Sequence, residues 1–267
     1  MKLKQTFGSD KPIIGMVHLP PLPSAPLYDA KGGMAKIVES CVRDIEALQS
    51  GGIDAIMFGN EGDRPYLLKA SPVTLASMAF VIGEVKRTIK VPFGVNYLWD
   101  PVATVSLAVA SGAAFAREIF TGVYDSDMGI WAPDAASALR IRSDSQRADL
   151  KLLFNINAEF ASPIGTRSIA QRAKSAVFSS LADVVLVSGP MTGQPVATAE
   201  LKQAKDALPD TPVFANTGVN IDNVAEVLKI ADGCVIGSHL KVDGNTWNNI
   251  DKARVKRFMD KVRKLRK

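Results

Sequence analysis

Four side chains that end or follow predicted strands could move protons. Glu61 and Asp63 lie close together in the segment GNEGDRPY, Asp127 lies in TGVYDSDMG, and His18 ends an apolar run. A carboxyl group in a partly desolvated site has a raised pKa and can act as a general acid or base, and a histidine can carry a proton or bind a hydroxyl group. We therefore interpret these four as candidate catalytic residues. Each has an alternative, because a carboxylate can form an ion pair within its loop and a lone histidine is often structural.

Two short turns contain glycines that could hold an anion. Gly218 follows the apolar run Val213–Ala215, and Gly237 and Ser238 follow the run Cys234–Ile236. Backbone N–H groups can converge on a phosphate at such turns, because a glycine has no side chain to crowd the approach. The pattern favours a phosphate site formed by these three residues. The alternative is that both glycines only allow tight turns from strand to helix.

Further polar residues end or follow the other predicted strands, and we expect them to bind the substrate: Asn96, Arg117, Asn155, Asn157, Ser188 and Asn216. The sequence lacks the motifs of nucleoside triphosphate loops, dinucleotide folds, zinc proteases and hydrolase serine elbows. Lys151 begins its strand and Lys241 lies beyond the last one, which disfavours a Schiff base. We predict no cofactor and assign no metal ligands. A divalent metal could use His18 with Asp63 or Glu61, but no spacing requires one.

All of these residues follow apolar runs that alternate with helical patterns along the chain. The runs are Ile13–Val17, Ile53–Phe58, Pro92–Val95, Phe115–Phe120, Lys151–Ile156, Val184–Val187, Val213–Ala215 and Cys234–Ile236. Helical patterns lie between them at about 34–49, 74–88, 101–110, 133–147, 168–181 and 198–208, and another begins near Asn220. Runs without polar alternation are typical of strands buried on both faces of a parallel sheet. Eight such units predict an α/β fold, the (β/α)8 TIM barrel, whose active site lies at the carboxyl ends of the strands.

The composition fits one soluble domain. The chain has 267 residues, of which 47% are hydrophobic and 22% are charged. No change in composition indicates a linker, so we predict a single domain over residues 1–267 with its barrel core at about 13–244. No secretory signal and no run of about 18 apolar residues is present, and we expect a cytoplasmic protein without a transmembrane segment. Cys41 and Cys234 have no ligand spacing and are expected to be inert core thiols.

The net charge of +5 is concentrated at one end of the chain. Residues 252–267 contain nine Lys or Arg and one Asp, so the remainder is net negative. In that segment Val255, Phe258, Met259 and Val262 recur at helical spacing, which predicts an amphipathic helix at about 250–266. Its basic residues are then a solvated face, and we expect no nucleic-acid partner.

Six segments, taken together and in order, resemble the BtpA/SgcQ family. They are IGMVHLPPLP, GNEGDRPY, GVNYLWD, SGPMTGQPV, NTGVNIDNV and ADGCVIGSHLKVDG, and they run from residue 13 to about 244. The resemblance implies a TIM barrel of the phosphate-binding type. Members of this family include one tied to photosystem I accumulation and another encoded among sugar-catabolism genes.

The chain departs from the pattern of many family members at two places. It reads REIF at Arg117–Phe120 where many members have RVNVL. After the fifth strand, Glu159-Phe160 occupies the place where many members have a Lys-His pair. These departures suggest a substrate different from that of the photosynthetic branch and place the chain nearer to the sugar-catabolism branch.

The candidate residues and the resemblance together predict an enzyme. Its substrate would be a phosphorylated sugar or a nucleoside-like sugar conjugate, and it would act as an isomerase, a lyase or a glycosidic hydrolase. Carboxylates would move protons while the glycine turns hold the phosphate. We expect a small phosphorylated metabolite as the partner, and the sequence leaves a homo-oligomer open. The alternative is a non-catalytic assembly or stability factor, as the photosystem connection of the family suggests.

Overall fold

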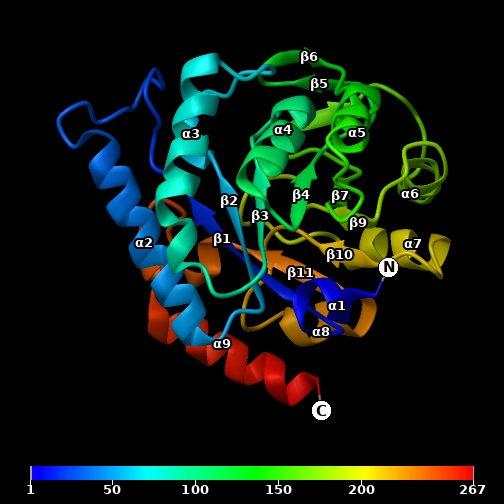
Figure 1. Cartoon of the computed structure of the whole chain (residues 1–267). Helices are drawn as coiled ribbons and strands as arrows, with labels where there is room; N and C mark the ends of the chain where they lie inside the picture. The colour runs from blue at the N-terminus through cyan, green and yellow to red at the C-terminus, as the bar shows by residue number, and fades with distance from the viewer. Residues whose placement is uncertain (1, 267) are drawn as a thin grey trace.

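Eight parallel strands close into a barrel in the computed structural model, which describes residues 2–266. The barrel strands are β1 (Ile13–His18), β2 (Ala55–Gly59), β3 (Phe93–Asn96), β4 (Phe115–Glu118), β7 (Lys151–Asn155), β9 (Val184–Val187), β10 (Val213–Ala215) and β11 (Gly233–Ile236). They pair in this order, and β11 pairs with β1 to complete the circle (Figure 1). The predicted TIM barrel is confirmed.

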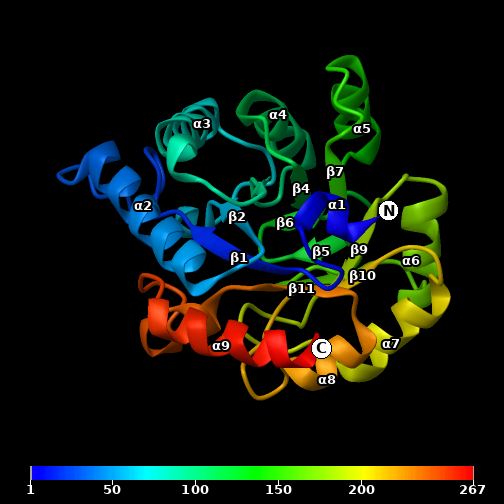
Figure 2. The same ribbon diagram turned by 60° about the horizontal axis from the view of Figure 1, so that its bottom comes forward.

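A ring of helices surrounds the barrel, as Figure 2 shows most clearly. These helices are α2 (Gly33–Gly51), α3 (Pro72–Val85), α4 (Pro101–Ser111), α5 (Ala135–Asp144), α6 (Ile169–Phe178), α7 (Thr198–Ala207), α8 (Val224–Ile230) and α9 (Lys252–Leu265), with short 3-10 turns η1 (Glu61–Asp63), η2 (Lys86–Thr88), η3 (Ser238–Leu240) and η4 (Val242–Gly244). Side chains fix several helix starts. The Asp100 carboxylate accepts N–H groups of the first turn of α4, and Ser168 and Gln171 form a capping box at α6. Within residues 2–266, no helix is long and apolar enough to cross a membrane.

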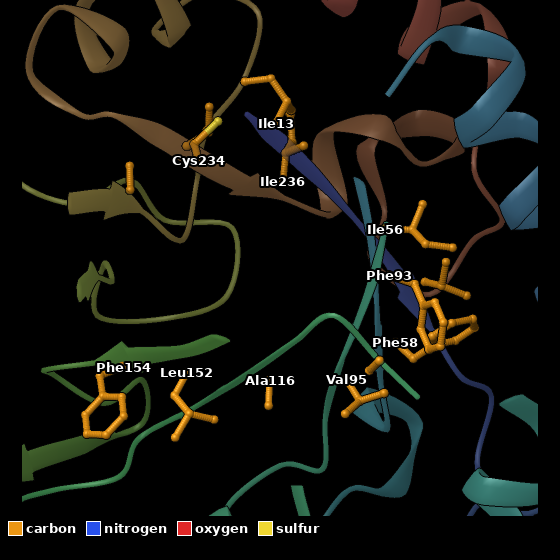
Figure 3. Close-up of a cluster of buried hydrophobic side chains, with 14 of the residues drawn as sticks. Ile13, Ile56, Phe58, Phe93, Val95, Ala116, Leu152, Phe154, Cys234 and Ile236 are labelled. Atoms are coloured by element: carbon orange, nitrogen blue, oxygen red, sulfur yellow. The ribbon is translucent and has the colours of Figure 1, made fainter. Parts of the chain in front are cut away.

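The main hydrophobic core lies between the strands and the helices. In Figure 3, Ile56 and Phe58 of β2 lie beside Phe93 of β3, and the rings of Phe58 and Phe93 meet edge to face with centroids 6.1 Å apart. This core includes the free thiols of Cys41 and Cys234. Burial raises the pKa of each thiol to about 12. Because the strands are buried on both faces, they have the continuous apolar runs from which the sequence analysis placed them.

A short helix that the sequence analysis did not predict closes the amino-terminal end of the barrel. This helix, α1 (Leu3–Phe7), lies across that end inside the helix ring (Figure 2). The Phe7 ring packs against Phe115 of β4 and Phe214 of β10, with centroids 5.2 Å and 6.1 Å away. Phe7 therefore completes the apolar cluster that fills the barrel interior.

A small antiparallel sheet covers part of the opposite end. It consists of β5 (Tyr124–Ser126) and β6 (Gly129–Trp131) from the segment after β4, and β8 (Ala161–Pro163) from the segment after β7. No strand was predicted in either segment from the sequence. Because β5 pairs with β8, the sheet links the chain after two neighbouring barrel strands and fixes how these segments approach the mouth.

A cation just beyond the basic terminal helix α9 holds its end against the barrel. Four apolar side chains of α9 are buried, as its amphipathic pattern predicts, and its other side carries exposed charges. Arg266, just beyond the helix, is an exception to this solvated face. Its guanidinium forms two hydrogen bonds with the Asp54 carboxylate and a third with the carbonyl of Lys11, and Asp54 also accepts the N–H of Ile13 at 2.8 Å.

We expect Arg266→Gln to lower the free energy of unfolding by about 1–3 kcal/mol, because the charge-assisted bonds to partly buried Asp54 are lost. The matched control is Lys264→Gln, which removes an exposed charge from the same helix and is expected to change stability by less than about 0.5 kcal/mol. Urea denaturation followed by circular dichroism measures both. Equal small effects in the two variants would contradict a structural role for Arg266.

Candidate active site

The last inward-facing position of each barrel strand contributes to a ring at the carboxyl end of the barrel. Alternation along the strands defines these positions, because residues two places earlier, such as Met16 and Leu153, belong to the cluster that fills the interior. The ring consists of His18, Gly59, Asn96, Arg117, Asn155, Ser188, Asn216 and Gly237. Six of these residues have polar side chains, so the barrel interior changes from apolar to polar at this level.

A cavity of about 500 Å³ opens above the ring. Its size lies within the roughly 300–1,000 Å³ of typical small-ligand sites. The structure brings these sequence-predicted residues together in its wall: His18, Glu61, Arg117, Asn155, Asn216, Gly218, Gly237 and Ser238. They come from six segments that are distant in the sequence, and the barrel closure makes them neighbours.

Arg117 is a buried cation without a partner. Only 7% of the residue is exposed, and within residues 2–266 its guanidinium forms no hydrogen bond or ion pair, with its Nε fully buried and unsatisfied. Burying a charge costs several kcal/mol unless a counter-charge and hydrogen bonds compensate it. A guanidinium left unpaired beside a cavity is therefore well suited to bind an anionic group of a ligand.

Glu61 and His18 are in contact beside Arg117. The turn η1 folds Glu61 back over Gly59, where any side chain would collide with the carboxylate, and Glu61 Oε1 lies 3.5 Å from His18 Nε2. Burial raises the pKa of Glu61 to about 7, against the opposing effect of Arg117. Burial, followed by the charge of Lys241, lowers the pKa of His18 well below its usual value. A neutral imidazole thus contacts a carboxyl group that titrates near neutral pH, an arrangement suited to proton transfer.

Two further carboxyl groups line the cavity, and neither was predicted from the sequence to be catalytic. Burial raises the pKa of Glu118 to about 7, and its carboxylate accepts the N–H groups of Ile119 at 2.8 Å and Trp99 at 3.2 Å. Burial also raises the pKa of Glu159, which accepts the hydroxyl of Thr192 at 2.7 Å. The signal for Glu118 was present, because two adjacent charges at Arg117 and Glu118 stand within a predicted buried strand.

The predicted phosphate turns lie at the cavity wall. Within residues 2–266, the N–H groups of Gly218, Val219, Ser238 and His239 donate no hydrogen bond, so they are free to bind an anion. The local structure also favours glycine at positions 218 and 237, independently of any ligand. Gly218 has a φ of +63° and packs against the backbone of the segment after β9, and a Cβ at Gly237 would lie 3.0 Å from the His18 ring. A phosphate role for Gly218, Gly237 and Ser238 stays a prediction.

The remaining predicted residues lie outside the cavity wall, where their side chains serve the scaffold or face solvent. The Asp63 carboxylate accepts the N–H of Leu22 at 2.8 Å and the amide of Asn60 at 3.0 Å, which ties together the loops after β1 and β2. Asp127 is exposed in the turn between β5 and β6. Catalytic roles for Asp63 and Asp127 stay predictions, and these placements make Glu61 the stronger candidate.

Three predicted substrate-binding residues sit one step behind the wall. Asn96 donates to the Glu118 carboxylate. Ser188 accepts hydrogen bonds from Asn155 at 2.7 Å and Asn216 at 2.9 Å, and the Asn157 amide bonds the backbone of Ser188. They therefore orient groups that line the cavity. Within residues 2–266, no three His, Cys, Asp or Glu side chains are grouped so that they could hold a metal ion.

Comparisons with known proteins agree with the resemblance seen in the sequence. The BtpA family model matches residues 9–264. SgcQ, an sgc region protein of Escherichia coli (strain K12), is 47% identical over 265 residues, which covers 99% of each chain. The photosystem I biogenesis protein BtpA of Synechocystis sp. is 32% identical, over 97% of this chain and 91% of that protein.

Solved structures match the fold at low sequence identity. Phosphoribosyl anthranilate isomerase from Thermus thermophilus superposes with a TM-score of 0.58 at 11% identity, covering 95% of this chain and 99% of that one. The enzyme of the same name from Thermococcus kodakaraensis has a TM-score of 0.55 at 14% identity, covering 96% and 99%. At these identities the likeness supports the TIM-barrel fold alone.

Proposed function

We propose that this chain, which belongs to the BtpA family, is an enzyme. It binds a phosphorylated sugar, or a sugar conjugate of the nucleoside type, in the cavity at the carboxyl end of the barrel. It moves a proton on this substrate, as an isomerase, a lyase or a glycosidic hydrolase does.

One observation carries the proposal: the unpaired guanidinium of Arg117 lies within the electrostatic reach of three cavity carboxyl groups with raised pKa values. Its charge is among the causes that act on the pKa values of Glu61, Glu118 and Glu159. A phosphorylated ligand would supply the hydrogen-bonded anionic partner that Arg117 lacks. The free N–H groups after β10 and β11 would supply directional donors to the same ligand.

Proton transfer is assigned to Glu61 first. With a pKa of about 7, its carboxyl group is close to half protonated at neutral pH and can give or accept a proton. His18 is neutral and lies beside it, so it can relay the proton or hold a substrate hydroxyl. The alternative is a non-catalytic assembly or stability factor, and the Synechocystis relative is named a photosystem I biogenesis protein. Such a factor would have no use for a titrating carboxyl group beside an unpaired arginine.

A thermal-shift panel tests the proposal. Ribose 5-phosphate, glucose 6-phosphate and nucleoside 5′-monophosphates are expected to raise the Tm, whereas the unphosphorylated sugars are not. A ligand at 100 times its Kd stabilises the protein by about 2.7 kcal/mol, an effect that the method resolves. Inorganic phosphate serves as the control for a bare anion. If no phosphorylated compound raises the Tm, the proposed function fails.

A further inference from the structure

We propose that the ligand of this cavity carries a flat aromatic group joined to its phosphorylated sugar, as in a nucleoside monophosphate or an aryl glycoside phosphate. Tyr66, Trp99 and Phe160 form the subsite for that group. The inference rests on the proposed function and selects, among its substrates, the sugar conjugate over the simple sugar phosphate.

The cavity has two chemically different sides. Apolar and aromatic side chains come from the loops after β2, β3, β4 and β7: Tyr66, Leu98, Trp99, Ile119 and Phe160. The loops after β10 and β11 contribute free N–H groups and small polar residues. In a closed barrel of eight strands, β3 stands opposite β10 and β4 stands opposite β11. An aromatic wall therefore faces the predicted phosphate turns across the mouth.

The aromatic wall is built from rings held in costly backbone conformations. Trp99 has a φ of +73° and Phe160 a φ of +53°, the left-handed region that bulky side chains rarely adopt. Such strain costs on the order of 1–3 kcal/mol per residue and persists where the surroundings enforce it, often at ligand sites. Two strained aromatic residues from separate loops, both lining one cavity, indicate that their placement serves a ligand.

The surroundings that hold these rings are visible. The N–H of Trp99 donates to the Glu118 carboxylate at 3.2 Å, and its indole packs edge to face on Trp131 with centroids 4.7 Å apart. Phe160 directly precedes β8, and its carbonyl accepts the N–H of Asp127 at 3.3 Å. The small sheet thus positions both residues, because its Trp131 packs against the Trp99 ring and its β5–β6 turn is hydrogen-bonded to the backbone of Phe160. A rigid aromatic surface binds a planar group at little cost in side-chain entropy.

Tyr66 completes the wall from a third loop. Its ring lies nearly parallel to that of Trp99, at 29° with centroids 6.4 Å apart, and its hydroxyl donates to the Glu61 carbonyl at 3.1 Å. The polar end of Tyr66 is therefore already satisfied, and its ring is what remains for a ligand. A polyhydroxyl compound would have to give up hydration against this wall, whereas a flat aromatic group would gain contact.

Isothermal titration calorimetry of the full chain separates the possibilities. The probes are ribose 5-phosphate, the four nucleoside 5′-monophosphates, adenosine, and 4-nitrophenyl glucoside 6-phosphate. At least one aromatic phosphate is expected to bind about tenfold or more tightly than ribose 5-phosphate, the increment of one good stacking contact. Trp99→Leu is expected to remove that increment, so that the aromatic phosphates bind no more tightly than ribose 5-phosphate does.

Phe160→Leu provides a second variant in case Trp99→Leu does not fold, with the same expected pattern. Phe178→Leu is the matched control, because that ring is 90% exposed at the end of α6, and its affinities should equal those of the wild type. If ribose 5-phosphate binds as tightly as every aromatic phosphate, the aromatic subsite is wrong and the proposed function stands. If no phosphorylated probe binds, the proposed function itself fails, and the subsite fails with it.

Discussion

Replacing Arg117 with Met is expected to weaken the binding of phosphorylated ligands by at least tenfold to a hundredfold while making the ligand-free protein more stable. Each charge-assisted hydrogen bond contributes about 1.5–3 kcal/mol, and 1.4 kcal/mol corresponds to a factor of ten in affinity. In the free protein the buried guanidinium has no hydrogen-bonded partner, and we expect its attraction to the three cavity carboxyl groups to offset only part of its desolvation. Its removal should therefore raise the free energy of unfolding by about 1–3 kcal/mol. Calorimetry with ribose 5-phosphate and urea denaturation at pH 7 measure the two effects.

The control for this variant is Arg142→Met. Arg142 lies outside the cavity and forms an ion pair with Asp183, with Nη1 3.1 Å from Oδ2. Because this pair is made in the free protein, its loss should lower stability and leave ligand affinity unchanged. The two arginine variants therefore shift stability in opposite directions. A fall in stability of Arg117→Met, combined with undiminished binding, would show that Arg117 is an ordinary structural cation.

Glu61→Gln is expected to reduce turnover by on the order of 100-fold or more, because the amide keeps the shape but cannot exchange a proton. The same change should alter how stability depends on pH. The carboxyl pKa rises from 4.5 to about 7 on folding, so the protonated form is favoured in the native state. The raised pKa of Glu61 therefore stabilises the folded state by on the order of 3 kcal/mol below about pH 4.5. This stabilisation is lost as the pH rises through about 7.

Glutamine imitates the protonated acid, so Glu61→Gln should fall less in stability between pH 5 and pH 8 than the wild type does. Because the pKa of Glu118 is also raised to about 7, the Glu61→Gln variant should retain part of the pH dependence of stability. The double variant with Glu118→Gln should lose that part as well. Glu46→Gln on the exposed side of α2 is the control and should reproduce the wild-type curve. The assignment is refuted if Glu61→Gln has wild-type turnover on a substrate that the panel identifies.

The barrel could be predicted from sequence because every one of its strands is buried on both faces. Runs such as Val184–Val187 contain no polar residue, and the structure places a strand over that range. The helix α1 could not be predicted, because five residues are too few to show a periodic pattern, and its stability comes from Phe7 entering the barrel. The small sheet was missed for a similar reason, since its three-residue strands depend on pairing between segments after different barrel strands.

The candidate site was predictable where strand periodicity alone decides the position. His18, Arg117 and Asn216 lie at or next to the ends of strands, and the alternation of inward and outward residues places them in the mouth. Loop residues are different, because a loop can aim a carboxylate in any direction. Glu61 and Asp63 are two positions apart, yet the turn η1 sends the first into the cavity and the second towards the N–H of Leu22. Pattern alone could not rank them.

The closed amino-terminal end of the barrel has a practical consequence for measuring ligands. Phe7 fills that end from α1, and Arg266 binds Asp54 and the carbonyl of Lys11, just before β2 and β1 begin. Both described ends of the chain thus lie on the face away from the cavity. A tether attached at either end would anchor the protein to a sensor surface with its mouth directed towards the flowing solution. Small ligands could then be exchanged over one orientation of the molecule without a linker crossing their path.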